Sequence, residues 1–71
     1  MNRFNPNKLY HSKWTAITPL QREKHFIVCE VTFTEQGSVE HCVLEAVYSG
    51  RQFDIDWRVL KNASQWQQGW K

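Results

Sequence analysis

The chain contains 71 residues with a formal net charge of +2, ten aromatic residues, four of them tryptophan, and two cysteines. This length fits one domain whose core supplies only about 3–5 kcal/mol, so large aromatic side chains or a partner must complete that core. Two cysteines are too few for the disulfide framework of a small secreted domain, and neither a signal sequence nor the ~20 apolar residues of a membrane span is present, so we expect a reduced, soluble, cytoplasmic protein.

The first part of the chain is basic and the rest is acidic. Residues 1–24 carry five Lys or Arg against one Glu, a net of +4, whereas residues 25–71 carry four against six acidic residues, a net of −2. We expect residues 1–10, which are rich in Asn, to form an N-terminal arm before a single small β domain at residues 11–71. The basic front segment is then expected to lie across the acidic body, although the same charge could meet phosphate.

Two strands are predicted before the middle of the chain. Residues 12–18 are rich in β-favouring types and are followed by Pro19, which predicts a strand that ends there. A long strand is then predicted over residues 25–34, after a short polar connection. Gln36-Gly37 is expected to form the next tight turn, because glycine readily adopts the positive φ that such a turn requires.

The turn at Gln36-Gly37 pairs residue i with residue 73 − i and thereby predicts one apolar face. In this register Cys29 faces Leu44 and Val31 faces Cys42. The predicted core face of the two strands is Ile27, Cys29, Val31, Phe33, Cys42, Leu44, Ala46 and Tyr48. A slip of one residue would move every side chain to the other face, so the uniform apolar character supports the register.

A second tight turn is predicted at Ser49-Gly50, where residue i pairs with 99 − i. Phe53, Ile55 and Trp57 then join the same apolar face, in the alternation typical of a strand with one side in water. This register sets Asp54 opposite Glu45, which is unfavourable for two like charges. We therefore predict that Lys13 or Lys24 lies near these carboxylates.

The C-terminal segment is predicted to fold back over the sheet. Residues 58–61 are long enough for one turn, and residues 62–64 could cap a short helix at residues 65–68, which Gly69 would end. Trp57 is assigned to the core, while Trp66 and Trp70, four residues apart, share a face and would form a lid. A ring left exposed beside Lys13 or Arg58 would be the best functional indication in the chain.

Together these patterns predict a mainly β fold. We expect a bent antiparallel sheet of four to five strands, SH3-like or a similar small barrel, with a short helical turn near the C-terminus.

Neither a metal site nor an enzyme active site is predicted. Cys29, Cys42 and the three histidines match no zinc-binding spacing, and His41 would lie on the face opposite both thiols. No nucleophile has a base and an orienting group that can be placed beside it. We expect no cofactor, no metal and no catalysis.

The residues that carry a family resemblance are spread along nearly the whole chain. They are Asn5-Pro6, Lys8-Leu9, Ser12-Lys13-Trp14-Thr15-Ala16, Pro19, Glu23-Lys24-His25-Phe26, Trp57-Arg58, Leu60, Trp66 and Gly69-Trp70. With them the chain resembles a family of small Trp-rich bacterial proteins of unknown function. The resemblance implies a free-standing domain in the bacterial cytoplasm and assigns no role to any residue.

The leading hypothesis is a non-catalytic interaction module whose partner is another protein or a second copy of the chain, with no membrane contact. The rival is single-stranded nucleic-acid binding through Trp14, Lys13 and nearby basic residues, because small β-barrels stack bases on exposed aromatic rings in a basic groove. The candidate ligand-binding residues are Lys13, Trp14, Lys24, Arg58, Trp66 and Trp70.

Overall fold

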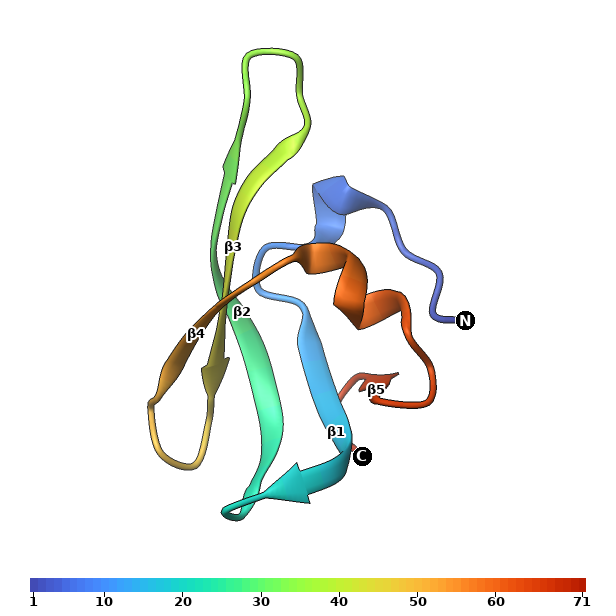
Figure 1. Cartoon of the computed structure of the whole chain (residues 1–71), viewed down its shortest axis with the longest axis vertical. Helices are drawn as coiled ribbons and strands as arrows, with labels where there is room; N and C mark the ends of the chain where they lie inside the picture. Colours follow the sequence, from blue (N-terminus) through green and yellow to red (C-terminus); the bar gives the residue numbers. More distant parts are fainter.

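The computed structural model describes all residues from 1 to 71 and consists of five β-strands and two short 3-10 helices, η1 and η2 (Figure 1). Their bounds are η1 Pro6–Lys8, β1 Lys13–Leu20, β2 Glu23–Phe33, β3 Val39–Ala46, β4 Gln52–Ile55, η2 Trp57–Lys61 and β5 Trp66–Gln68. The strands form one antiparallel sheet in the order β4-β3-β2-β1-β5. The predicted mainly β fold of four to five strands with a short helical turn near the C-terminus is confirmed. The edges β4 and β5 do not pair with each other, so the sheet is open.

The first strand continues past the proline that was expected to end it. Pro19 lies inside β1, which reaches Leu20. The turn to β2 is only Gln21-Arg22, and both residues have positive φ, 52° and 65°. Primed turns of this kind match the twist of the two strands they join, which explains why two non-glycine residues adopt this conformation. The break in the β1–β2 register between Thr15 and Leu20 accommodates the missing amide of Pro19.

The register predicted for β2 and β3 holds over only part of the hairpin. Val31 pairs with Cys42 as expected, but the register shifts at Cys29, after which Val28 pairs with Leu44. Such a bulge adds one residue to one strand and exchanges the faces of all residues beyond it. As a result Phe26 and Val28 are buried in the core, in place of the predicted Ile27 and Cys29.

The register predicted for β3 and β4 is wrong by two residues. Leu44 pairs with Phe53, and the loop between the strands is longer than the expected Ser49-Gly50 turn. A shift of two keeps each side chain on its face, so Phe53 and Ile55 still face the core. Gln52, and not Asp54, lies opposite Glu45.

The change in register removes the predicted repulsion and the predicted lysine contact. Gln52 Nε2 donates a hydrogen bond of 2.9 Å to Glu45 Oε1. The Asp54 carboxylate lies 3.9 Å from His41 Nδ1. Neither Lys13 nor Lys24 forms an ion pair with these carboxylates. Lys13 shares the row of Glu45 but lies two strands away from it, across Ile27.

The C-terminal segment adds a strand where a short helix was predicted. Residues 66–68 form β5, which pairs with β1 so that Trp66 lies opposite Ala16. The helical turn lies earlier, in η2, where the Asp56 side chain accepts a hydrogen bond from the Arg58 amide and so caps the first turn. Trp57 begins η2 and packs against the core instead of ending a strand.

One half of the core face is covered by the N-terminal residues and η2. The core consists of Leu9, Trp14, Phe26, Val28, Cys42, Leu44, Ala46 and Leu60. The ring of Phe4 packs edge-on against Trp14 and Trp57, at 5.2 Å and 5.8 Å between ring centres. The Asn2 side chain holds this cover in place by donating hydrogen bonds of 2.8 Å to the carbonyls of Leu60 and Trp66. The expected N-terminal arm thus lies on the domain and contributes Leu9 to its core.

Candidate functional site

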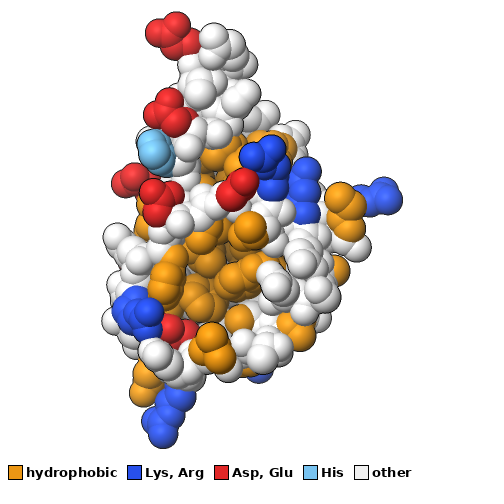
Figure 2. Space-filling view, viewed as in Figure 1, with side chains coloured by type: hydrophobic (Ala, Val, Ile, Leu, Met, Phe, Trp, Pro, Cys, Tyr) orange, Lys and Arg blue, Asp and Glu red, His pale blue; other side chains and the backbone are white.

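The other half of the core face is a groove with an aromatic floor. Its volume is about 490 Å³, and seven of its twelve lining residues are hydrophobic. Figure 2 shows these hydrophobic side chains gathered in the middle of the face, with charged side chains mostly around them. Residues of both edge strands line the groove, Phe53 in β4 and Trp66 in β5, so it opens between the two edges of the sheet.

Three aromatic rings from distant parts of the chain build this floor. Phe26 lies in the middle, 6.3 Å from the ring centre of Phe53 and 5.2 Å from that of Trp66. The bulge in β2 turns Phe26 toward this face, and the pairing of β5 with β1 brings Trp66 beside it. Leu20, at the end of β1, extends the apolar surface outward and is 73% exposed.

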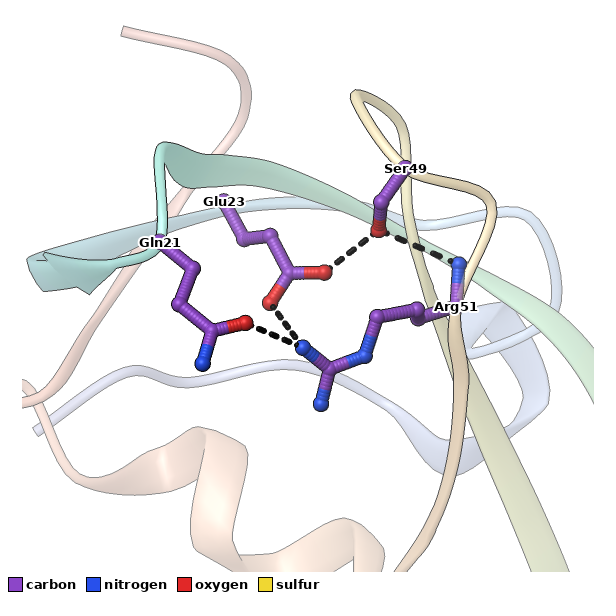
Figure 3. Close-up of polar contacts among 4 residues, drawn as sticks. All are labelled: Gln21, Glu23, Ser49 and Arg51. Carbon is purple, nitrogen blue, oxygen red and sulfur yellow. Dashed lines mark hydrogen bonds and ion pairs between the residues drawn. The ribbon is translucent and has the colours of Figure 1, made fainter.

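A polar network of four side chains closes one end of the groove (Figure 3). Glu23 is buried, and its carboxylate accepts a hydrogen bond from the Ser49 hydroxyl. Arg51 Nη1 lies 3.3 Å from the other oxygen of Glu23 and donates a 2.6 Å hydrogen bond to Gln21 Oε1. The Arg51 guanidinium also lies over the ring of Phe53, 5.0 Å from its centre.

The charged and polar groups of this network are paired with one another and stabilise the groove. A buried carboxylate is tolerated when it is paired and hydrogen-bonded, and Arg51 and Ser49 satisfy that requirement for Glu23. The network joins the β1–β2 turn to the β3–β4 loop, and so it fixes the distance between two sides of the groove. The groove therefore presents a shaped apolar surface with one compensated charge at its end.

An exposed tryptophan ring, that of Trp70, lies on the opposite face of the sheet. Lys13 alternates with the buried Trp14 along β1 and so projects from the other face. Lys13 Nζ lies over the Trp70 ring, 4.9 Å from its centre, and Trp70 is 44% exposed. The indole is fixed because its Nε1 donates a 3.0 Å hydrogen bond to the carbonyl of Phe26. Trp70 is thus an exposed ring beside Lys13, the arrangement expected to be the best functional indication in the chain.

The buried hydroxyl of Thr15 helps to hold the C-terminal residues after β5. Thr15 Oγ1 donates a 2.7 Å hydrogen bond to the Gly69 carbonyl and accepts one of 2.9 Å from the Lys71 amide. Gly69 has a φ of 81°, which allows the chain to turn from β5 onto the second face. The chain reversal explains how Trp66 and Trp70, predicted to form one lid, lie on opposite faces.

The other predicted site residues are separated from one another. Trp14 is 1% exposed and its Nε1 donates to the Ser12 hydroxyl, so its ring offers no face for stacking a base. Lys24 is exposed on β2. Arg58 is held by Asp56, with 3.1 Å from Nη2 to Oδ2, and its hydrogen bonds to that carboxylate lower the pKa of Asp56. Of the six predicted residues only Trp66 lines the groove.

Several residues that build the groove could not be identified from the sequence pattern. Phe26 is not part of the predicted core face, which contains Ile27 and Cys29, because the bulge at Cys29 exchanges the two faces of β2. The prediction that a strand ends at Pro19 places Leu20 in the following connection, whereas Leu20 lies in β1. The link between Glu23 and Arg51 joins positions 28 residues apart, and neither has a sequence pattern that would identify its partner.

The thiols and histidines form no metal cluster. No group of three or more His, Cys, Asp or Glu side chains lies close enough together to hold a metal ion. Both cysteines are free, and burial raises the pKa of Cys42 to about 11. The structure also contains no helix that is both long and apolar enough to cross a membrane.

Comparison with known proteins gives one family. A family model described as "Tryptophan-rich protein (DUF2389)" matches residues 12–71. No curated protein and no solved structure matches the chain.

Proposed function

The chain belongs to the Tryptophan-rich protein family DUF2389, whose function is unknown, and for this member we propose the role of a non-catalytic protein-interaction module. The observation that carries the proposal is the uncovered aromatic half of the core face. Apolar clefts with a few fixed polar groups are the usual sites of recognition, because binding removes their surface from water.

The size and openness of the groove favour a protein segment as the ligand. Its floor of Phe26, Phe53 and Trp66 continues onto the exposed side chain of Leu20, well beyond an enclosed pocket. Aromatic rings are enriched in the buried centre of protein interfaces, where they contribute much of the binding energy. A side chain from a partner would fill the groove and bury Leu20 at its margin.

The polar groups at the groove argue against catalysis there. Acid–base or nucleophilic chemistry needs a titratable group that is free to exchange a proton or attack a substrate. Glu23 is already paired with Arg51 and hydrogen-bonded to Ser49, so it is engaged in structure.

The free cysteines and the resemblance to bacterial proteins support a place in the bacterial cytoplasm.

Selection from a phage-displayed library of random peptides tests the groove. The immobilised native protein should enrich peptides that bind it in solution. The variant Leu20→Asp should lose them, because it places a charge at the margin of an apolar site. Ile17→Asp is the matched control, since Ile17 is also exposed on β1 but does not line the groove. Equal binding by both variants, or no enriched peptide, would overturn the proposal.

Single-stranded nucleic acid is the second candidate, favoured by the exposed Trp70 ring beside Lys13. Stacking of a base on an aromatic ring is worth about 1–3 kcal/mol, and nearby cations add a salt-dependent term. Trp70 in place of the buried Trp14 would be the stacking platform. A short single-stranded DNA should shift the indole signal of Trp70 at low salt and release it at high salt. The absence of a shift at low salt would dispose of this candidate.

A further inference from the structure

We infer that the partner of the groove is an extended segment that pairs with the free edge of β4 and alternates large apolar residues with Lys or Arg. This inference rests on the proposed function and specifies its ligand. Three features of β4 lead to it, namely its backbone, its inward side chains and its outward charge.

The backbone edge of β4 has free hydrogen-bonding groups. The Ala46 amide donates to the Arg51 carbonyl at 2.8 Å, which identifies this pair as hydrogen-bonded. Hydrogen-bonded pairs alternate along an antiparallel ladder, so the backbone groups of Gln52 and Asp54 point away from β3. Neither residue takes part in a backbone hydrogen bond to a turn, loop or cap. Their amides and carbonyls can therefore accept an added strand.

An added strand would lie where the groove opens. Phe53 and Ile55 project from β4 into the groove, and Trp66 lines it from the opposite edge of the sheet. Successive side chains of a strand point to opposite faces, so every second residue of the segment would point toward these rings. These positions select large apolar side chains, since the seven hydrophobic lining residues form the floor.

The outer face beside β4 is acidic, and Lys13, which shares the row of Glu45, lies two strands away from it on β1. Glu30, Val43 and Asp54 lie in one row across β2, β3 and β4, and Glu45 lies in the next. No Lys or Arg forms an ion pair with these three carboxylates, and only His41 approaches Asp54. Opposite charges on neighbouring strands stabilise their pairing. The outward positions of the segment therefore select Lys or Arg.

The same charges disfavour a second copy of the chain as the added strand. Antiparallel pairing of two β4 strands would place Asp54 of one copy on the strand next to Asp54 of the other, with Glu45 one strand further away on each side. Like charges on paired strands are destabilising. The β4 edge can thus pair with a basic segment but not with the β4 edge of a second copy. The free protein should therefore sediment as a monomer.

Hydrogen exchange with two defined peptides tests the inference. The probes are short, end-blocked peptides that alternate Val or Phe with Lys in one and with Glu in the other. The Lys peptide should protect the amides of Gln52 and Asp54, and each opposed charge pair should change affinity by up to about five-fold relative to the Glu peptide. Methylating the peptide amides that face β4 should abolish the protection.

Charge variants provide the internal comparison. Asp54→Lys should weaken the Lys peptide and strengthen the Glu peptide, whereas Glu35→Lys, in the exposed β2–β3 turn, should leave both unchanged. One contrary result is a peptide that loses its binding in Leu20→Asp and yet leaves the amides of Gln52 and Asp54 unprotected in the native protein. That result would overturn strand addition but leave the groove as the binding surface. If neither peptide binds and the library also yields none, the proposed function itself fails.

Discussion

Replacing Leu9 by alanine should strongly destabilise the protein, although the residue lies in the segment before the first strand. Its side chain is fully buried, and its carbonyl accepts hydrogen bonds from both the amide and the hydroxyl of Ser12. Truncating a buried leucine typically costs about 2–5 kcal/mol, because apolar contact is lost and a cavity remains. A chain of this length has about 4–11 kcal/mol of total stability, so Leu9→Ala removes a large share of it.

Urea denaturation followed by tryptophan fluorescence measures this loss as a fall in the midpoint. Tyr10→Ala is the matched control, because Tyr10 is the next residue and is 55% exposed. Its free energy of unfolding should change by no more than about 0.5 kcal/mol. Equal effects of the two substitutions would refute the packing of the N-terminal residues, and with it the cover over half of the core face.

Three further results are expected. Burial raises the pKa of Cys42 to about 11, so as the pH rises the unfolded state loses the thiol proton before the folded state does. The stability that this difference contributes is complete below pH 9.0 and is lost toward pH 11. Urea titrations at several pH values should find a smaller decline in the free energy of unfolding for Cys42→Ala, and an equal decline in both proteins would contradict this. Glu23→Gln should lower the free energy of unfolding by about 1–3 kcal/mol, since Arg51 loses its charged partner, and a thermal melt equal to that of the native protein would show that this network adds no stability. Trp70→Phe should cost about 0.5–1.5 kcal/mol through the lost hydrogen bond to Phe26, and an unaltered urea midpoint would mean that the indole is not held there.

The strand content was predictable because alternation and turn residues are local signals. The two hairpins joining β2, β3 and β4 were expected in nearly the right places, and the face of β4 was correct despite a register error of two. Cys29 shows the limit of this reasoning. A bulge there satisfies the packing of Phe26 and Val28, which is a property of the whole sheet and leaves no mark in the local pattern.

The candidate site was harder to predict because it depends on which half of a face stays uncovered. Trp14 and Trp70 are both tryptophans next to a lysine in the sequence, yet Trp14 is buried and Trp70 is 44% exposed. Their difference arises from Phe4, which covers Trp14, and from Gly69, which carries Trp70 to the second face. These differences depend on how each end of the chain packs against the sheet, which cannot be inferred from spacing alone.

The most direct test of the groove as the binding surface is an NMR measurement of contacts between labelled protein and a library-selected peptide. The rings of Phe53 and Trp66 should both show intermolecular contacts to apolar side chains of the peptide, because they line opposite sides of the groove. Contacts confined to Trp70 and Lys13, on the other face, would contradict the account.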